Sequence, residues 1–230
     1  MDEIIIRVDG RGFTKFTNKY FDKPFDKKFS EAMTVATYNV MKNGGMPIIR
    51  AYTQSDEASF LLHPETNCFG RRTEKIASVM SGLMTRYFAI ELMKLNKIEA
   101  MKDASFDGKV FVVEKHEVEA YFDARYHNSI NNYMMQWSHF NLKKLGWSGK
   151  RINDTFKAEG GWKYAGIKLD FLNQIAYGTE FRKERILKKT INQLTGDDVV
   201  VERSHIFARA PVRFDEHRKD YNIARDENYN

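Results

Sequence analysis

The chain has 230 residues, 42% of them hydrophobic and 13% aromatic, a content that excludes wholesale disorder and predicts a substantial core. Lys and Arg outnumber Asp and Glu by 37 to 31, and the pI of about 9.2 favours nucleic acid or nucleotides as partners without excluding an acidic protein. The single cysteine, Cys68, excludes an internal disulfide and a cysteine-based zinc cluster. No apolar run reaches the roughly 20 residues that span a membrane, so we expect no membrane association and a soluble, intracellular, cytoplasmic protein.

The first predicted strand covers residues 4–9, where Ile4, Ile6 and Val8 alternate with their neighbours. It ends on Asp9 and runs into the turn Gly10-Arg11-Gly12. Two glycines separated by one residue permit positive φ and a close approach of backbone to ligand, as phosphate-binding turns require.

A helix is predicted to follow Asp26, which is a suitable N-cap, and to end at Gly44-Gly45. Its buried face is indicated by apolar residues at spacings of four, three and four, namely Phe29, Met33, Ala36 and Val40.

A hairpin with an acidic tip is predicted next, because residues of high β propensity at 48–53 and 60–62 flank the polar stretch Gln54-Ser55-Asp56-Glu57. The stretch also has the composition of an ordinary solvated turn. Asp9 at the end of the first strand is a second acidic position, and together with Asp56 it makes a functional site more plausible than an ordinary turn.

A second helix is predicted from an apolar stripe, and a cluster of cations precedes it. The stripe consists of Ile76, Met80, Leu83, Tyr87 and Ile90. Arg71, Arg72 and Lys75 fall at the helix N-terminus, where cations and free amide groups together make a good anion site. An ordinary solvated basic cluster explains them equally well.

Residues 105–113 read as one more strand, which completes the order strand, helix, two strands, helix, strand. This βαββαβ order predicts an α+β fold with a ferredoxin-type sheet and helices on one face. In such a sheet the first strand lies beside the hairpin, so Asp9 and Asp56 are expected side by side. Two acids on adjacent strands are costly without a cation, and a pair of Mg²⁺ ions would resolve the conflict.

The rest of the chain is less regular, and we draw a boundary near residue 140 between a catalytic domain, 1–140, and a region, 141–230, packed on it. Residues 115–140 are predicted to be helical in their first part, and residues 148–159 to form a short helix closed by Gly160-Gly161. Asn128 and Asn131 are interleaved with aromatics, which suits either base recognition or a polar helix face.

The segments 182–190 and 199–203 mix basic and apolar residues without a clear period. Arg182 and Lys183 suit contact with a nucleic-acid backbone, although a solvated face explains them as well.

Over about its first half, the chain resembles the tRNA-His guanylyltransferase family and its guanylyltransferase-like relatives. The matching blocks are Arg7-Val8-Asp9-Gly10-Arg11-Gly12-Phe13, Lys23-Pro24 with Asp26, Gln54-Ser55-Asp56-Glu57, Arg71-Arg72 with Lys75, and Ser105-Phe106-Asp107-Gly108-Lys109-Val110.

The resemblance implies a palm-like catalytic domain that adds nucleotides to the 5′ end of tRNA, in the 3′-to-5′ direction. A nucleoside triphosphate, GTP or ATP, activates the 5′-monophosphate, and the 3′-hydroxyl of an incoming nucleotide then attacks. The resemblance also implies two Mg²⁺ ions, tRNA as partner and a homotetramer.

Roles follow residue by residue from the family motifs. Asp9 and Asp56 would be carboxylate ligands of the metals, with the Gly10 carbonyl as a backbone ligand and Glu57 beside them. The nucleotide would be held by Asp9, Gly10, Arg11, Gly12, Phe13, Thr14, Lys23, Asp26, Ser55 and Asp56. A second phosphate or the tRNA 5′ end would be held by Arg71, Arg72 and Lys75, with weaker tRNA contacts from Asn128, Asn131, Arg182 and Lys183.

Two departures from the family pattern refine this reading. Phe25 replaces an amide residue of the block that contains Lys23 and Asp26, which removes one nucleotide contact. Asn128-Ser129-Ile130-Asn131 is closer to the guanylyltransferase-like members, which favours template-dependent repair of tRNA 5′ ends over addition of a single G to tRNA-His.

The sequence is also compatible with two other classes of protein. A palm-fold forward polymerase or a nucleotide cyclase would share the two acids. A non-catalytic RNA-binding module would share the strand order, but it predicts stacking aromatics on the central strands instead of acids at their ends.

Overall fold

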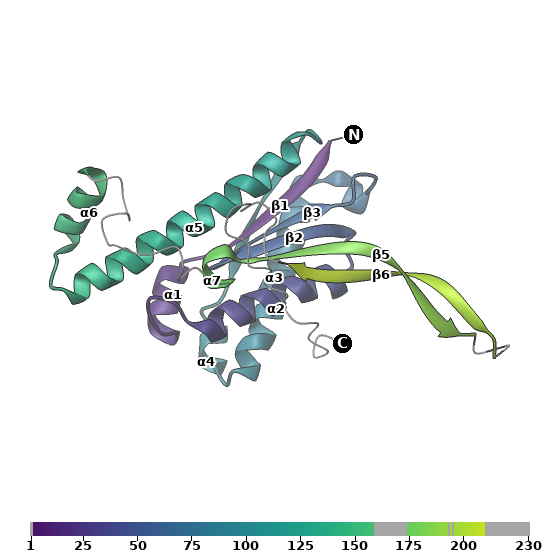
Figure 1. The fold of residues 1–230 in the computed structure, drawn as a ribbon, viewed down its shortest axis with the longest axis horizontal. Helices are drawn as coiled ribbons and strands as arrows, with labels where there is room; N and C mark the ends of the chain where they lie inside the picture. Colours follow the sequence, from purple (N-terminus) through teal and green to yellow (C-terminus); the bar gives the residue numbers. More distant parts are fainter. Residues whose placement is uncertain (1, 159–173, 193, 195, 210–230) are drawn as a thin grey trace.

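The structure, a computed structural model, describes residues 2–158, 174–192, 194 and 196–209. Its centre is a six-stranded sheet with the strand order β4-β1-β3-β2-β5-β6, in which every neighbouring pair is antiparallel (Figure 1). The strands are β1 (Glu3–Gly10), β2 (Ile48–Gln54), β3 (Glu57–Leu62), β4 (Phe106–Val113), β5 (Thr179–Ile191) and β6 (Asp198–Arg209).

The first four strands form the predicted βαββαβ unit. β1 leads through α1 (Phe13–Tyr20) and α2 (Lys27–Asn43) to the β2–β3 hairpin, and α3 (Thr73–Lys94) leads on to β4. This connection places β1 between β3 and β4 in the sheet. The α+β class and the strand order predicted from the sequence are therefore confirmed.

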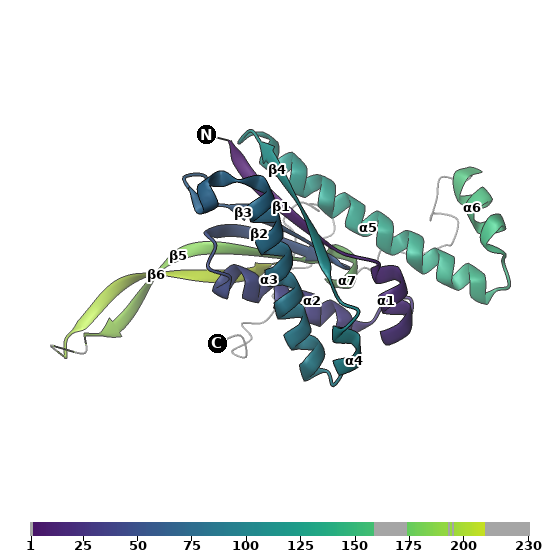
Figure 2. The same cartoon turned by 180° about the vertical axis from the view of Figure 1, so that it is seen from behind.

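Alternating side chains give the sheet an apolar layer on each face, and helices cover both. One face packs against α2 and α3 through residues that include Ile4, Ile6 and Val8. The other face packs against α5 (Glu117–Lys144) through Ile5, Tyr52, Leu61, Val118, Phe122 and Tyr126. The predicted one-sided arrangement holds only for α2 and α3, which Figure 2 shows in front of the sheet. It is wrong for α5, because a sheet that is apolar on both faces needs cover on both.

β5 extends the sheet beyond β2, and a buried ion pair fixes the junction. Arg50 of β2 is 5% exposed and lies 2.6 Å from Glu180 of β5, which is fully buried. Arg50 also binds two residues of α5, the Glu119 carboxylate at 2.7 Å and the Tyr126 hydroxyl at 2.8 Å. The boundary drawn near residue 140 thus falls inside α5, and chain segments on both sides of it contribute strands to one sheet.

The rest of β5 and β6 projects from the sheet as a two-stranded arm (Figure 1). The two strands pair from Glu180 with Arg209 to Ile191 with Asp198, whereas β2 pairs only with residues 179–182 of β5. Sequence reasoning missed this arm, because both of its faces mix charged and apolar residues, so neither shows the period of a half-buried strand.

The remaining elements are short. They are a 3₁₀ turn (Cys68–Arg71), α4 (Ile98–Met101), α6 (Gly149–Ala158) and α7 (Gln174–Tyr177). α6 confirms the short helix predicted at 148–159, while Gly160-Gly161 lies outside the described residues. In the described part of the chain, no helix has both the length and the apolar character that crossing a bilayer requires.

Candidate active site

Asp9 and Asp56 meet because β1 ends where the β2–β3 hairpin turns. Asp9 lies opposite Glu57, the first residue of β3, in the β1–β3 ladder. The Gly10 amide donates a 3.0 Å hydrogen bond to the Asp56 carbonyl oxygen, which joins the end of β1 to the hairpin turn. The strand order therefore brings together the two acids that are 47 positions apart in the sequence.

A third carboxylate, missed by sequence reasoning, joins this edge of the sheet. Asp107 lies opposite Asp9 in the β1–β4 ladder. The pKa of Asp9 is raised by burial first, and then by the negative charges of Asp56 and Asp107. A sequence signal did exist, because β1 and β4 each carry an Asp-Gly pair, Asp9-Gly10 and Asp107-Gly108.

The donor groups at this edge fit a magnesium ion that shares its ligands with a substrate. Mg²⁺ typically takes one or two protein carboxylates and completes its shell with water and substrate phosphates. Burial raises the pKa of Asp56 as well as that of Asp9, so a cation here would relieve unfavourable charge. Among the described residues, no three or more His, Cys, Asp or Glu side chains are grouped as a metal cage.

Glu57 has different surroundings from the two aspartates. Both of its carboxylate oxygens accept hydrogen bonds from Arg125 of α5, from Nε and Nη2 at 2.7 Å each, and Arg7 Nε lies 3.9 Å away. Burial raises the pKa of Glu57, and the charges of Arg125 and Arg7 oppose that shift. Glu57 thus anchors α5 to the end of the sheet, and its oxygens are already engaged.

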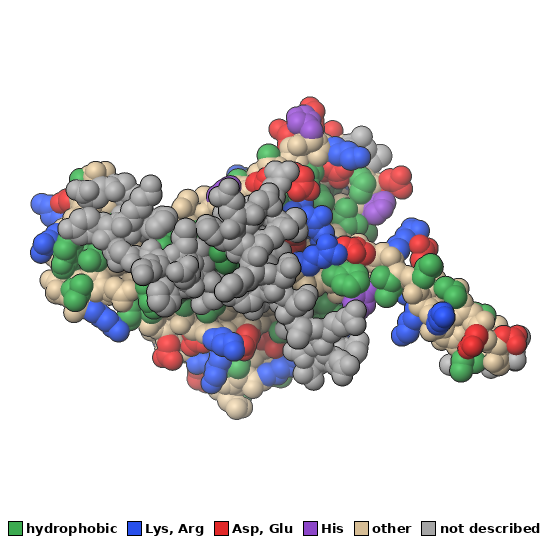
Figure 3. Space-filling model, viewed as in Figure 1, with side chains coloured by type: hydrophobic (Ala, Val, Ile, Leu, Met, Phe, Trp, Pro, Cys, Tyr) green, Lys and Arg blue, Asp and Glu red, His purple; other side chains and the backbone are tan. Residues whose placement is uncertain are grey.

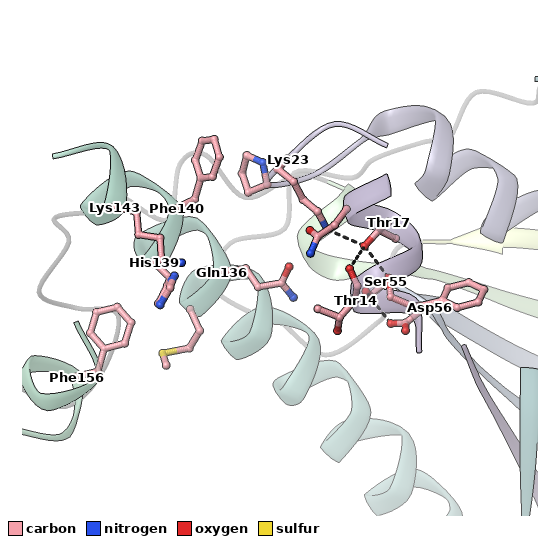
Figure 4. Close-up of a pocket in the computed structure, with 14 residues that line it drawn as sticks. Thr14, Thr17, Lys23, Ser55, Asp56, Gln136, His139, Phe140, Lys143 and Phe156 are labelled. Atoms are coloured by element: carbon pink, nitrogen blue, oxygen red, sulfur yellow. Dashed lines mark hydrogen bonds between the residues drawn. The ribbon is translucent and has the colours of Figure 1, made fainter. Parts of the chain in front are cut away.

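A cavity of about 610 Å³ opens beside Asp56 (Figure 4). We call its polar side the inner wall, which consists of Thr14, Thr17, Asn18, Lys23, Ser55 and Asp56. Lys23 Nζ donates a hydrogen bond to Thr17 Oγ1 at 2.7 Å, and Ser55 Oγ donates one to Asp56 Oδ1 at 3.0 Å. Burial lowers the pKa of Lys23, and the charge of Asp56 acts against that change. Hydroxyl and ammonium groups therefore share this wall with the Asp56 carboxylate, and Ser55 donates to that carboxylate directly.

The opposite side of the cavity was missed by sequence reasoning. We call it the outer wall, which consists of Met135, Gln136, His139, Phe140, Lys143 and Phe156, from α5 and α6. The sequence pattern that could have indicated this wall is the spacing of residues 136, 139, 140 and 143, which places them on one face of a helix. Because this stripe lies beyond the sheet, only the tertiary structure shows that it faces the acidic turn.

The turn after β1 contains two glycines, Gly10 and Gly12, which are required for different structural reasons. A side chain at Gly10 would lie 2.3 Å from the ring of Phe13, so the backbone there passes directly over that ring. Gly12 has a φ of 69° and ends the turn at the start of α1. Phe13 itself is a core residue at 2% exposure, while Arg11 and Thr14 are exposed. Of the predicted nucleotide-binding set, Phe13 thus contributes mainly packing.

Asp26 has the capping role that the sequence predicts. Its Oδ1 accepts hydrogen bonds from the amides of Lys28 at 2.8 Å and Phe29 at 3.2 Å, at the first turn of α2. Its Oδ2 accepts one from the Asp22 amide at 3.0 Å. These three bonds fix the loop that carries Lys23 toward the cavity.

The basic cluster before α3 is not brought to the acidic pair. Arg71 donates hydrogen bonds to the carbonyl oxygens of Asp2, Pro64 and Thr66. Asp2 precedes β1 whereas Asp9 lies near its end, and a strand rise of roughly 3.3 Å per residue separates them by about 20 Å. Arg72 and Lys75 lie with Arg71 at this far end, where both are exposed.

The predicted tRNA contacts are spread over the surface. Asn128 and Asn131 are exposed on α5. Arg182 pairs with the buried Glu180 at 2.8 Å, and Lys183 is exposed on β5. None of these four residues lines the cavity beside Asp56.

The antiparallel βαββαβ sheet, with an acidic pair beside a polar cavity, defines an α+β protein suited to binding a phosphate-bearing ligand. A family model described as tRNA-His guanylyltransferase matches residues 1–127, more than half of the chain. The chain belongs to this family. The match includes both aspartates and the inner wall, and it ends before the outer wall and the arm.

Relatives with similar sequences carry the same description. The chain is 44% identical over 87 residues to the tRNA(His) guanylyltransferase of Neurospora crassa, covering 37% of this chain and 29% of that enzyme. It is 36% identical over 107 residues to the Schizosaccharomyces pombe enzyme, covering 46% and 41%. The matched stretch therefore spans less than half the length of either fungal enzyme.

Solved structures share the fold over most of the chain. A bacterial tRNA(His) guanylyltransferase-like protein in complex with ATP has a TM-score of 0.64 and 26% identity, covering 80% of this chain and 79% of that one. The Saccharomyces cerevisiae enzyme has a TM-score of 0.62 at 21% identity, covering 78% and 84%, which shows similarity of fold.

Proposed function

We propose that this protein is a nucleotidyltransferase that adds nucleotides to the 5′ end of tRNA in the 3′-to-5′ direction. The observation that carries the proposal is the placement of Asp9 and Asp56 together at the end of the central strands, with Asp56 lining a cavity rich in hydroxyl and ammonium donors. Acids at the ends of a ferredoxin-type sheet are what a palm-like catalytic domain requires.

Phosphoryl transfer depends mainly on positioning and charge neutralisation, and the chain supplies groups for both. Lys23, Thr17 and Ser55 would bind the triphosphate on the inner wall. When bound, two Mg²⁺ ions held by Asp9, Asp56 and the Gly10 carbonyl would neutralise the charge on the transferred phosphate. Glu57 would act as a positioning residue through Arg125.

The substrates follow from the family. The bacterial relative that was solved with ATP supports a nucleoside triphosphate, ATP or GTP, as the activating substrate. We propose tRNA as the acceptor, with repair of truncated 5′ ends preferred over single G addition because of the Asn128-Ser129-Ile130-Asn131 block. We retain the homotetramer as an expectation, and Arg72 and Lys75 as candidate backbone contacts remote from the acidic pair.

The non-catalytic RNA-binding alternative is disfavoured by the position of α5. RNA-recognition sheets stack unpaired bases on exposed aromatics of their central strands. Here the corresponding face is covered by α5, which buries Ile5, Tyr52 and Leu61. Forward polymerases and cyclases share the acidic pair, and only the chemistry at the RNA end separates them from this proposal.

The test supplies purified protein with Mg²⁺, all four nucleoside triphosphates and a 5′-monophosphorylated tRNA that lacks its first nucleotide. We expect extension at the 5′ end, read by mapping both ends of the RNA. An intact tRNA-His in parallel separates repair from single G addition. The Asp56→Asn variant is the matched control and should leave the RNA unchanged. Extension at the 3′ end, or none with any tRNA, would contradict the proposal.

A further inference from the structure

Most of the outer wall of the cavity is formed by one surface of α5, and Phe156 of α6 completes it. Gln136, His139, Phe140 and Lys143 form one stripe of α5 that faces the cavity (Figure 4). The other side of the same helix is used for packing, since Met134, Ser138 and Leu142 are buried. Within the described part of the chain, the stripe is therefore available to a ligand, with Lys144 Nζ lying 4.4 Å from the centroid of the Phe140 ring.

Beyond the stripe, positive charge continues along the end of α5 and onto α6. Residues 141–158 contain five cations and one acid, Asp154, which gives this segment a net charge of +4 against +6 for the whole chain. The cations are Lys143, Lys144, Lys150, Arg151 and Lys157. None of the five forms an ion pair within the described residues, and Figure 3 shows Lys and Arg side chains at the α6 end of the molecule.

Helix stabilisation explains only part of this charge. Lys143 and Lys144 lie in the last turn of α5, where cations interact favourably with the helix dipole. Lys150 and Arg151 lie in the first turn of α6, where the same dipole disfavours them. α6 packs on the end of α5, because Ile152 and Phe156 form a small buried cluster with Leu142. Its basic residues therefore lie beside those at the end of α5.

The extent of this surface points to a polyanion longer than a free nucleotide. Lys143 lines the cavity, whereas Lys150 and Lys157 do not. A nucleotide bound at Asp56 could meet the first lysine but has no phosphates to reach the others. A strand of RNA whose 5′ end enters the cavity has one phosphate for each nucleotide.

We propose that the outer wall and the adjoining basic surface of α6 bind the RNA substrate next to its 5′ end. Lys143 and His139 contact the phosphates nearest the end, Phe140 offers an apolar contact to the terminal base, and Lys150 contacts the backbone farther along. This assignment rests on the proposed function for the identity of the polyanion. It involves residues beyond the part of the chain that matches the family model.

The test measures RNA binding without chemistry. A 5′-monophosphorylated tRNA with a 3′ fluorophore is titrated with full-length protein in EDTA, followed by anisotropy at several salt concentrations. We expect Lys143→Glu and Lys150→Glu each to weaken binding about tenfold and to reduce the slope of log affinity against log salt by about 1. GTP binding, measured separately with Mg²⁺, should change less than about twofold for Lys150→Glu, because Lys150 lies outside the cavity.

Lys42→Glu is the matched control, because Lys42 is an exposed lysine in the last turn of α2, away from this surface. It should bind RNA like the wild type. Unchanged RNA affinity in both test variants, with folding verified by circular dichroism, would overturn the assignment. Weaker GTP binding with unchanged RNA binding would also overturn it, since the outer wall would then hold the nucleotide. Weakened RNA binding in a protein without 5′ extension would refute the proposed function and leave this surface assigned.

Discussion

At the residue scale, the carboxylates of Asp9 and Glu57 lie opposite each other in the sheet but have contrasting electrostatic surroundings. Asp9 keeps part of its side chain at the surface, but partial burial and two neighbouring acids, Asp56 and Asp107, raise its pKa, so its charge is opposed. Glu57 is more enclosed, and its carboxylate is paired with two nitrogens of Arg125, whose charge opposes the rise in pKa that burial causes. The first arrangement suits a cation site, and the second suits a structural anchor.

Asp9→Asn should stabilise the metal-free protein while abolishing nucleotide addition. The raised pKa of Asp9 means that its charged form is disfavoured in the folded state at neutral pH. Because the side chain is exposed, screening limits the gain to a few tenths of a kcal/mol, about 1 °C in the thermal midpoint. Activity should fall by at least about 100-fold, since the carboxylate that we propose as a metal ligand is lost. Calorimetry in EDTA and the 5′-extension assay give the two readouts, and a lower midpoint with full activity would contradict the assignment.

Arg125→Ala should destabilise the fold, because it leaves the Glu57 carboxylate enclosed without its partner. We expect a loss of about 1–3 kcal/mol at pH 7 by urea unfolding, whereas Arg125→Lys should retain part of that stability. Without Arg125, burial keeps the pKa of Glu57 above its unfolded value. The variant then loses stability as the pH rises through the raised pKa of Glu57. Its deficit in unfolding free energy against wild type should therefore be larger at pH 8 than at pH 4.5. A pH-independent deficit would mean that Glu57 is not the group responsible.

At the element scale, the β1–α1 turn connects the core to the site through steric contact. Gly10 passes over the ring of Phe13, which packs against Phe16, Phe88 and Phe106. Gly10 also donates, through its amide, the hydrogen bond that joins β1 to the acidic hairpin. A change at this turn therefore acts on the core and on the position of Asp9 together.

Gly10→Ala should destabilise the protein more than Gly12→Ala. The new methyl group at Gly10 would overlap a ring that is held by other rings, and overpacking of this kind costs typically 1–3 kcal/mol. At Gly12 there is open space, so the cost is that of a left-handed conformation, about 1 kcal/mol. Urea unfolding of the two variants checks the order, and equal losses would argue against the steric account.

At the scale of the whole molecule, the sheet continues into an arm that the core does not support. Leu187 is 77% exposed and Val200 is 58% exposed, although both lie in paired strands. Two-stranded ribbons are marginal alone, so the arm is expected to depend on the strand ends that enter the sheet.

Shortening the arm should leave the fold intact. Replacing residues 185–204 by Asn-Gly joins Glu184 to its ladder partner His205 through a two-residue turn. We expect the thermal midpoint to stay within about 2–4 °C, which corresponds to roughly 1 kcal/mol for a protein of this size. Light scattering at the same concentrations reports the oligomeric state. A much lower thermal midpoint together with a lower molecular mass by light scattering would show that another copy of the chain supports the arm.

The local pattern of the first half was enough to predict its elements. The spacing from Phe29 to Val40, the cap at Asp26 and the stripe from Ile76 to Ile90 correspond to α2 and α3, because amphipathic periodicity depends on neighbours along the chain. α1 was not predicted although Phe13, Phe16 and Tyr20 have helical spacing, since it is only eight residues long and no side chain caps its N-terminus.

The sequence by itself determined the βαββαβ order, the family and the meeting of Asp9 with Asp56, because strand order follows from the order of periodic segments. Only the tertiary structure decided which other groups join them. Asp107, Arg125 and the outer wall come from distant elements, and their contacts depend on ladder register and on the path of α5 across the sheet. The tertiary structure also separated Arg71 from the acidic pair. Arg71 binds the chain just before the start of β1, whereas Asp9 lies near the end of that strand.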